Sequence, residues 1–589
     1  MTYGQLTPTT SNTATGERNI DSLISAKRYL HESKQSSGGM GGDPEQPPYG
    51  GDEPPIGGGE PPIDPIDPPD ESDEPVGIKT RITYSFPDEF RDKDYESDYG
   101  GFDGFNAFNS AQKAATRSIM KMYESVANFD LDELTDNKDR DATIRLANAD
   151  GTNRFDGIAG FPSEPDFMQG DVWIDSVNDP RNTNPKIGNK GYWVLMHEIG
   201  HALGLTHSHE THANLDGPMD SWLDSKEFTV MSYKAHVGGE LIPNPVDEVD
   251  QPQSLMMYDI AAIQAMYGAN FDTRSGNTTY TFSTSTGEMF ANGQSLGKPE
   301  NNTIFRTIWD GNGRDTYDFS NTGRSQSINL RPGAWSDLSA DSTAQNARLK
   351  IEWGGVVTKR ARGHIANALQ HNDDPRSLIE NAKGGGGSDT IQGNIARNHL
   401  YGNVGDDRLW GWDNNDTLDG GSEDDLLFGG RHNDILKGGP GNDILVGADP
   451  YSNTPHNEVD VLWGGADADR FVLGLASDYS VPTVGGPPAN RILYDDNVVW
   501  TEGQNSYALI MDFELGIDRI QLRGDSRDYN WRSVEVVHDN QTYLGTGIYV
   551  DNPVPHRDEL IGVLVGVNAS QISVYDSSQF SYVYATTEF

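Results

Sequence analysis

One run of the chain reads His-Glu-Ile-Gly-His-Ala-Leu-Gly-Leu-Thr-His and begins at His197. Residues four apart on a helix lie on the same face, so His197 and His201 can direct two imidazole nitrogens at one metal ion. Glu198 would stand beside that ion, where a general base can take a proton from a polarised water. Gly204 tolerates the left-handed angles that end a helix, so the chain can turn back and bring in His207. Three protein ligands and one open position predict a catalytic zinc site, not a closed structural one.

The alternative is a helix whose histidines fall into register by chance. The chain has 14 histidines in 589 residues, so a chance match of all five fixed positions has a probability on the order of one in ten thousand. We therefore favour the metal site. His209 and His212 follow the run closely and could compete for the metal, but we interpret them as solvated loop residues.

The histidine run, followed by Met231-Ser232-Tyr233, resembles the metzincins and, within them, the serralysin family of secreted bacterial zinc proteases. The resemblance implies that the three histidines bind one catalytic Zn²⁺ and that the glutamate acts first as base and then as acid. It also implies that Met231 lies beneath the zinc site in a tight turn. Tyr233 would be a further zinc ligand at rest, and would swing away to stabilise the oxyanion.

The composition restricts the partners and the location of the protein. The formal net charge is -46, from 90 acidic and 44 basic residues, which argues against a nucleic-acid partner and calls for divalent counter-ions. There are no cysteines, so stability must come from the core or from metals. We find no apolar run able to span a bilayer and no N-terminal signal of the secretory type. The resemblance implies a secreted, extracellular monomer, exported in one step by a type I secretion system that recognises the C-terminal end.

The pattern along the chain, with the resemblance, predicts an α/β metzincin catalytic domain, then an all-β parallel β-roll and a β-rich C-terminal module. The expected segments are an N-terminal segment with a short helix within 19–30 (1–33), a disordered linker rich in Pro, Gly and acidic residues (34–77), the zinc metalloprotease domain (78–270), a linker and the start of a β-sandwich or β-roll with calcium sites (271–383), the nonapeptide β-roll (384–472) and a C-terminal module with the secretion signal (473–589).

Within the catalytic domain, we expect strands at 82–86, 142–146 and 170–175, and helices at 112–128 and 257–268. The resemblance makes the strand before the zinc helix the sheet edge along which an extended substrate pairs, through Gly170, Asp171, Val172 and Trp173. Edge strands offer free backbone groups, so they suit peptide binding. The alternative is a plain sheet strand.

Two turns after the catalytic domain resemble the serralysin linker that wraps the first calcium ions. The resemblance implies that Arg274, Gly276 and Thr278 supply carbonyl oxygens, and that Asp310 and Asp315 supply carboxylates.

From Gly384 the sequence repeats every nine residues, in the pattern of the GGxGxDxUx calcium repeat. Glycine opens each unit at Gly384, Gly393, Gly402, Gly411, Gly420, Gly429 and Gly438, and Gly385 follows the first of them. The sixth position holds Asp389, Asp407, Asp416, Asp425, Asp434 and Asp443, with Asn398 in the second unit, and the repeat resumes around Asp469. The eighth position holds Ile391, Leu400, Leu409, Leu418, Leu427, Leu436 and Leu445.

In this pattern, glycines permit tight turns that expose carbonyl oxygens, and each aspartate adds a carboxylate oxygen suited to Ca²⁺. Two units would make one turn of a parallel β-roll, with the aliphatic residues facing inward. Unshielded aspartates repel one another, so we expect the module to bind several structural Ca²⁺ ions and to fold only with them. The alternative, a disordered Gly/Asp linker, does not explain the strict spacing.

These patterns predict a secreted, calcium-stabilised zinc endopeptidase that acts on protein or peptide substrates. The alternative is a calcium-binding extracellular matrix or surface protein whose protease domain is silent. We favour the enzyme because every catalytic position of the histidine run is intact.

Overall fold

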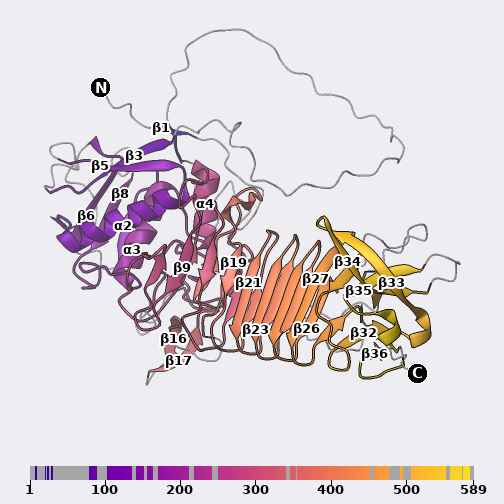
Figure 1. Cartoon of the computed structure of the whole chain (residues 1–589). Helices are drawn as coiled ribbons and strands as arrows, with labels where there is room; N and C mark the ends of the chain where they lie inside the picture. The colour runs from indigo at the N-terminus through magenta and orange to yellow at the C-terminus, as the bar shows by residue number, and fades with distance from the viewer. Residues whose placement is uncertain are drawn as a thin grey trace, which may run out of the picture.

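The computed structural model describes Thr7–Thr9, Ile20, Leu23, Ile24, Arg28–Leu30 and residues 79–583, except 89–102, 136–140, 151–155, 163–169, 211–217, 242–249, 340–344, 353–354, 451–456, 476–490, 495–505, 552–557 and 574. The predicted linker 34–77 and the last six residues, 584–589, lie outside the described residues. The described parts follow one another in space as they do in sequence (Figure 1). A helical part (79–268) is at one end, a stack of parallel strands is in the middle, and an antiparallel β part is at the other end.

The N-terminal segment packs onto the helical part. Strand β1 (Thr7–Thr9) pairs antiparallel with β2 (Arg28–Leu30). Between them, Leu23 and Ile24 are buried in the core, and Ile24 forms a β-bridge with Leu205. The predicted helix does not continue to the end of 19–30, because the backbone of 28–30 pairs with 7–9 instead of with the preceding turn. Among the described residues of that segment, only Ile20 is helical.

The helical part contains a sheet with strand order β5-β3-β6-β8-β7, and β4 pairs with β6. Its strands are β3 (Thr80–Ser85), β4 (Asp103–Asn106), β5 (Phe129–Glu133), β6 (Ile144–Asp150), β7 (Gly157–Ala159) and β8 (Asp171–Asp175). Strands β5, β3, β6 and β8 run parallel, whereas β7 and β4 run antiparallel to their neighbours.

The expectation that residues 170–173 form the sheet edge is wrong. Strand β8 pairs with β6 on one side and with β7 on the other, and all five of its residues are buried. Gly170 lies in the turn before β8, with φ 71°. Asp171 is committed to a buried ion pair with Arg145 at 2.8 Å. Among the described residues, the edge strand on this side of the sheet is β7, a short strand whose pattern is too brief to be recognised from sequence.

Three helices pack with this sheet. They are α2 (Ser110–Val126), α3 (Lys190–Leu203) and α4 (Met257–Tyr267), which agree with the predicted helices to within about two residues at either end. Helix α2 is amphipathic and begins at a capping box formed by Asn109 and Gln112. Helices α3 and α4 are buried over almost their whole length, so they form the centre of a large apolar core. No described helix combines the length and the apolar character needed to cross a membrane.

Residues 279–367 connect the helical part to the repeats through short strands. These are β9 (Thr279–Phe282), β10 (Met289–Ala291), β11 (Gln294–Ser295), β12 (Arg306–Ile308), β13 (Thr316–Asp318), β14 (Ser327–Asn329), β15 (Trp335–Ser336), β16 (Arg348–Glu352), β17 (Val356–Arg360) and β18 (Ile365–Asn367). A 3-10 turn at Pro375–Ser377 leads into the first repeat strand.

In the repeats, successive strands alternate between two sheets, so two nine-residue units make one turn. One sheet holds β19 (Asn381–Lys383), β21 (His399–Val404), β23 (Thr417–Ser422), β25 (Ile435–Pro440) and β27 (Val459–Ala466). The other holds β20 (Thr390–Gln392), β22 (Arg408–Trp412), β24 (Leu426–Gly430), β26 (Ile444–Ala448) and β28 (Arg470–Val472). We call residues 381–472 the strand coil.

The eighth-position aliphatic residues form the core of the strand coil. Leu400 pairs with Leu418, and Leu418 pairs with Leu436, always one turn later. On the opposite sheet, Ile391, Leu409, Leu427 and Leu445 stack in the same way, and all of these residues are fully buried. A single small side chain per unit therefore suffices to fill the narrow space between the sheets.

The chain ends in a β-rich part that continues both sheets. Its strands are β29 (Gly474–Leu475), β30 (Arg491–Ile492), β31 (Tyr507–Ile510), β32 (Arg519–Arg523), β33 (Tyr529–His538), β34 (Gln541–Val550), β35 (Glu559–Val565) and β36 (Phe580–Val583), with 3-10 turns at Ser526–Asp528 and Ala569–Gln571. Strands β33, β34 and β35 form an antiparallel meander.

Candidate metal centre and calcium ladder

The local sequence explains why α3 begins and ends where it does. The side chain of Asn189 caps the helix by accepting the backbone N–H of Tyr192 at 3.0 Å. At the other end, Gly204 adopts φ 109° and ψ 6°. This left-handed residue stops the helix three residues after His201, as the glycine in the histidine run predicts. The backbone N–H of Leu205 then bonds to the carbonyl of Gly200 at 2.8 Å and starts the return of the chain toward His207.

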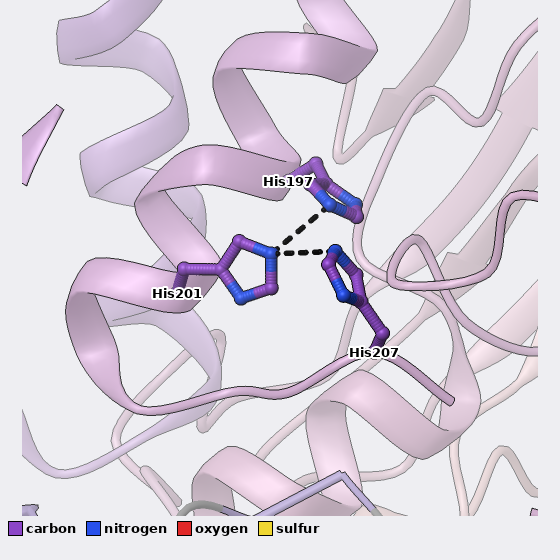
Figure 2. A group of neighbouring side chains, drawn as sticks. All are labelled: His197, His201 and His207. Carbon is purple, nitrogen blue, oxygen red and sulfur yellow. Dashed lines mark hydrogen bonds between the residues drawn. The ribbon is translucent and has the colours of Figure 1, made fainter. Parts of the chain in front are cut away.

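The three histidines of the run converge (Figure 2). The Nε2 atom of His201 lies 3.1 Å from Nε2 of His197 and 3.0 Å from Nε2 of His207. The hydroxyl of Tyr233 lies 2.7 Å from Nε2 of His207. Three ring nitrogens and a phenol oxygen, carried by a helix, a return loop and a later turn, therefore face one point.

The opposite ring nitrogens fix the orientation of the imidazoles. Nδ1 of His197 lies 2.9 Å from the carbonyl oxygen of Val230, and Nδ1 of His201 lies 2.7 Å from that of Leu205. Nδ1 of His207 instead faces the carboxylate of Glu210 at 2.9 Å. With a proton on each Nδ1, the lone pair on each Nε2 is free, and this tautomer of histidine can bind a metal through Nε2.

The electrostatics of the cluster also suit a divalent cation. Burial lowers the pKa of His197 well below its usual value, and the neighbouring His201 and His207 lower it further. The imidazole therefore stays neutral at physiological pH, as a metal ligand must. Three nitrogen donors of this kind fit zinc, which favours imidazole ligands in tetrahedral geometry.

Glu198 lies on the same helix, beside the histidines and almost fully buried. Burial and, to a smaller extent, the nearby Asp156 raise its pKa to about 8. Strand β7 runs directly past it, since a Cβ added at Gly157 would lie 2.8 Å from Cγ of Glu198. The free sheet edge and the buried carboxyl group are thus adjacent.

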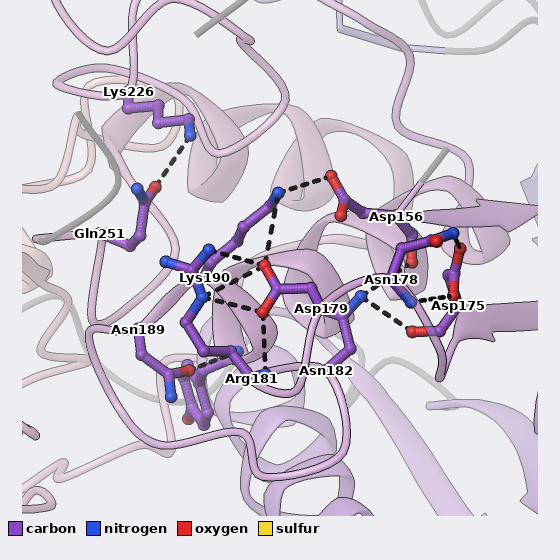
Figure 3. Close-up of polar contacts among 11 residues, drawn as sticks. Asp156, Asp175, Asn178, Asp179, Arg181, Asn182, Asn189, Lys190, Lys226 and Gln251 are labelled. Carbon is purple, nitrogen blue, oxygen red and sulfur yellow. Dashed lines mark hydrogen bonds and ion pairs between the residues drawn. The ribbon is translucent and has the colours of Figure 1, made fainter. Parts of the chain in front are cut away.

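A polar network anchors the start of α3 beside this carboxyl group (Figure 3). The ammonium of Lys190 lies 2.9 Å from Asp156 and 3.6 Å from Asp179. Asp179 also pairs with Arg181 at 2.7 Å. The network balances the charge of Asp156 and fixes the first turn of the helix that carries the histidines.

Met231 is fully buried, and its sulfur lies against α3 at Gly200. A Cβ added at Gly200 would lie 3.0 Å from its sulfur, so the glycine lets the turn approach the helix. Asp259 on α4 holds this turn: its carboxylate accepts the hydroxyl of Thr229 at 2.5 Å and the backbone N–H of Val230 at 2.8 Å. Because the carbonyl of Val230 in turn orients His197, α4 positions a candidate ligand from a distance.

Sequence reasoning missed three carboxylates of the site. These are Glu210 on His207, Asp259 under the turn, and Asp224, which accepts the hydroxyls of Ser208 and Ser232, each at 2.6 Å. Their spacing in the sequence carries no recognisable pattern. Glu210 offers one signal, since an acid three residues after a candidate ligand can reach its second nitrogen.

His209, interpreted as a solvated loop residue, is half-buried and packs on the Tyr233 ring, and His212 lies outside the described residues.

The sixth-position aspartates form two ladders through the strand coil. In each ladder, the backbone N–H of one aspartate donates to Oδ1 of the aspartate one turn later: Asp407 to Asp425 in one ladder and Asp416 to Asp434 in the other, both at 2.8 Å. The second oxygen, Oδ2, is buried and has no hydrogen-bond partner at Asp407, Asp416, Asp425, Asp434, Asp443 and Asp469. Unpartnered buried carboxylate oxygens in regular rows are a donor set for hard cations such as Ca²⁺.

The glycine that opens each unit leaves room for the aspartate carboxylate of the same unit. A Cβ at Gly384, Gly402, Gly420, Gly429 or Gly438 would overlap the carboxylate of its own unit, at Asp389, Asp407, Asp425, Asp434 or Asp443. Gly385 donates its N–H to Oδ2 of Asp389 at 2.6 Å. Burial raises the pKa of Asp407, Asp425 and Asp469 to about 8. The described residues therefore supply no positive charge to balance these carboxylates.

Asn398, which replaces aspartate in the second unit, has no such unmet oxygen. Its Oδ1 accepts the N–H of Asn394 at 2.7 Å, and its Nδ2 donates to the carbonyl of Glu380 at 2.9 Å. Both polar atoms of the Asn398 amide are therefore hydrogen-bonded, whereas an aspartate at this position would leave one carboxylate oxygen without a partner.

The segment from Arg274 to Asp315, which is predicted to bind the first calcium ions, also has buried carboxylate oxygens without hydrogen-bond partners. Oδ1 of Asp315 accepts the N–H of Thr278 at 2.7 Å, while its Oδ2 and the Oδ1 of Asp310 are buried without a partner. Burial raises the pKa of Asp310 to about 6 and that of Asp315 to about 9. Arg274 has a left-handed backbone at φ 51°, and the carbonyl of Gly276 accepts the Thr278 hydroxyl at 3.0 Å.

Comparison with known proteins assigns the parts of the chain. Residues 105–232 match the matrixin model of peptidase M10, and residues 269–349 match the model of the peptidase M10 serralysin C terminal. Residues 383–418, 410–445 and 459–479 match the RTX calcium-binding nonapeptide repeat.

Individual relatives give the same assignment. The chain is 30% identical over 348 residues to a serralysin of Proteus mirabilis, which covers 55% of this chain and 62% of that protein. It is 31% identical to serralysin G of Dickeya chrysanthemi, over 55% and 61% of the two chains. It is 32% identical to metallopeptidase AprA of Pseudomonas marginalis, over 51% and 57%. The chain thus spans about 60% of the length of these relatives. In this order along one sequence, the matches resemble a serralysin: a segment of the peptidase M10 matrixin type, a segment of the serralysin C-terminal type and RTX calcium-binding repeats.

Proposed function

We propose that the protein is a zinc endopeptidase whose ligands are His197, His201 and His207, with Tyr233 as a further ligand at rest. The convergence of the three Nε2 atoms carries this proposal: that of His201 lies 3.1 Å from that of His197 and 3.0 Å from that of His207. When bound, zinc would polarise the scissile carbonyl and make a water at the remaining position acidic. The catalytic domain would extend over residues 78–270.

The residues around this point have separate tasks. Glu198 accepts a proton from the attacking water at a carboxylate oxygen and passes it to the leaving amine nitrogen. Its burial among apolar groups keeps its pKa high, so it can hold that proton between the two steps. The Tyr233 hydroxyl donates a hydrogen bond to the oxyanion that forms on the substrate. Met231 and Gly204 support the site without touching the substrate.

We further propose that the substrate backbone pairs with β7 rather than with Gly170, Asp171, Val172 and Trp173. Strand β7 has its outer edge free among the described residues, and it passes beside Glu198. A peptide added to this edge would place its scissile bond near the glutamate, with an extended backbone.

The strand coil would be a calcium-filled β-roll, with ions held by the aspartate rows and by glycine carbonyls. The segment from Arg274 to Asp315 would hold the first ions, with its carbonyls and the carboxylates of Asp310 and Asp315 as donors. Ca²⁺ at the millimolar level outside cells would fill such sites, so the protein would fold and act after export, through a type I system. A calcium-binding protein with a silent protease domain is not favoured, because the candidate catalytic groups are assembled.

The test is hydrolysis of casein by the purified full chain in excess Ca²⁺. Activity should disappear with a zinc-selective chelator such as 1,10-phenanthroline and return on addition of Zn²⁺. Activity that withstands complete zinc removal, or a zinc-loaded protein that cleaves no protein substrate, would refute the proposal.

A further inference from the structure

A cavity of about 210 Å³ lies away from the histidines, where the helical part meets the segment that follows it. Its walls come from the second half of α2, from Ser254 and Leu255 just before α4, and from β12. Arg274 and Leu296 complete it. The cavity is therefore enclosed by elements that are far apart in sequence and that join two parts of the molecule.

The charge of this cavity is opposite to that of the whole protein. The described residues that line it include three cations, Lys121, Arg274 and Arg306, and no acid, although the formal net charge of the chain is -46. None of the three forms an ion pair with any residue that the structure describes. The charge of Arg274 acts on the nearby Asp310 and Asp315, which leaves Lys121 and Arg306 to attract an anion from solution.

Of the three cations, Arg306 is the most buried, and one of its hydrogen-bond donors has no acceptor. Its side chain is only 4% exposed. One guanidinium nitrogen, Nη2, donates to the carbonyl of Leu296 at 3.2 Å, but the buried Nε–H has no acceptor. Burial, with a smaller contribution from Arg274, lowers the pKa of Arg306 to about 10, so the group remains charged at neutral pH. A buried charge with an unused donor is unfavourable unless something neutralises it.

The remaining walls indicate what the anion carries. Met122, Leu255, Ile260, Leu296 and Ile308 provide an apolar surface. The hydroxyl of Ser254 is used within the protein, since it donates to the carbonyl of Leu255 at 2.8 Å. Apolar walls with a few convergent polar groups are typical of sites for small organic molecules. We propose that this cavity binds a small organic anion, with a carboxylate held by Arg306 and Lys121 and a short apolar body against the aliphatic walls.

The test is isothermal titration of the calcium-loaded full chain with hexanoate, at constant ionic strength set with chloride. Hexanoate should bind, and hexanamide, which has the same shape without the charge, should bind at least about tenfold more weakly. Arg306→Gln should weaken hexanoate binding roughly tenfold, and Lys121→Gln roughly threefold, because Lys121 is exposed.

Lys113→Gln is the matched control. Lys113 lies on the same helix over the ring of Phe86, outside the cavity, and its loss removes the same charge. Hexanoate affinity should stay unchanged in this variant. If Arg306→Gln fails to fold by circular dichroism, Lys121→Gln still decides the question. Equal binding of hexanamide, or equal effects of the Lys121 and Lys113 variants, would overturn the proposal. Binding of sulfate without binding of hexanoate would overturn the apolar part of it.

Discussion

At the scale of single residues, the candidate ligands differ in what holds their second ring nitrogen. His197 and His201 face backbone carbonyls, whereas His207 faces the carboxylate of Glu210. A carboxylate partner fixes the tautomer of an imidazole and increases its basicity, which strengthens the bond to a metal. His207 also lies on a loop, so it depends on this contact more than the two helical histidines do.

Glu210→Gln should therefore weaken zinc binding roughly tenfold, because the carboxylate that orients His207 is lost. Competition with a fluorescent zinc chelator measures this affinity without reference to catalysis. Glu240→Gln is the control, since Glu240 is an exposed acid of the same region. Unchanged zinc affinity in the Glu210 variant would mean that the loop alone positions His207.

Glu198→Gln should leave zinc binding intact and lower the rate of peptide hydrolysis by roughly a thousandfold or more, since an amide cannot accept the proton of the attacking water. Zinc content and casein hydrolysis, measured on the same preparation, separate the two effects. Turnover near the wild-type rate would remove Glu198 from its proposed role.

The histidine run could be recognised from sequence because all its members are local and their spacing follows from helix geometry. Asp259 could not be recognised from the sequence, because it contacts the Val230 backbone from a helix 29 residues later in the chain. The supporting carboxylates are placed by packing, which leaves no periodic signal in the sequence.

At the scale of elements, the repeat was predictable down to the register, since each unit places its aliphatic residue between the same two sheets. The edge strand of the sheet could not be predicted, because an edge depends on which strands pair, and pairing is decided by distant residues. The alternation indicated that residues 170–175 form a strand and the resemblance made that strand the edge, yet β7 covers it.

The aspartate ladders predict a pH dependence of the strand coil. In the folded coil without calcium, the pKa values of Asp389 and Asp443 are about 6 and those of Asp407 and Asp425 about 8, against about 4 in the unfolded chain. The folded state then holds protons that the unfolded state has lost. The coil should therefore need calcium to fold at neutral pH, and calcium-free protein should lose stability as the pH rises from about 4 to about 8.

Calcium should remove this dependence by supplying the missing positive charge. Thermal unfolding of the β-rich part, followed by circular dichroism at pH 5 and pH 8 with and without Ca²⁺, measures the effect. The control is Glu535→Gln, an exposed acid on β33 outside the ladders, which should leave both profiles unchanged. A calcium-free protein that is more stable at pH 8 than at pH 5 would contradict the charge argument.

At the scale of the whole molecule, the N-terminal segment belongs to the helical part although much of the sequence separates them. Leu23 and Ile24 lie in the main core, and the carbonyl of Leu23 accepts the N–H of Thr206 at 3.0 Å, one residue before His207. This segment was assigned to a separate N-terminal unit from sequence, because its contacts are made with residues about 180 positions later.

A single cut between Leu30 and Lys79 should therefore leave both pieces together. With a specific protease site inserted in residues 31–78, the cleaved protein should give two bands on a denaturing gel and one peak in size exclusion. Replacing both Leu23 and Ile24 by aspartate should release the small piece, since it removes two fully buried apolar side chains. Separate peaks from the unsubstituted protein would show that the docking is too weak to persist.

The docking at Leu205 and Thr206 means that cleavage would turn one polypeptide into a peptide and its receptor. The lifetime of the loop that carries His207 would then depend on how quickly that peptide dissociates. Dilution, which does not affect an uncut chain, would become a way to inactivate the protein.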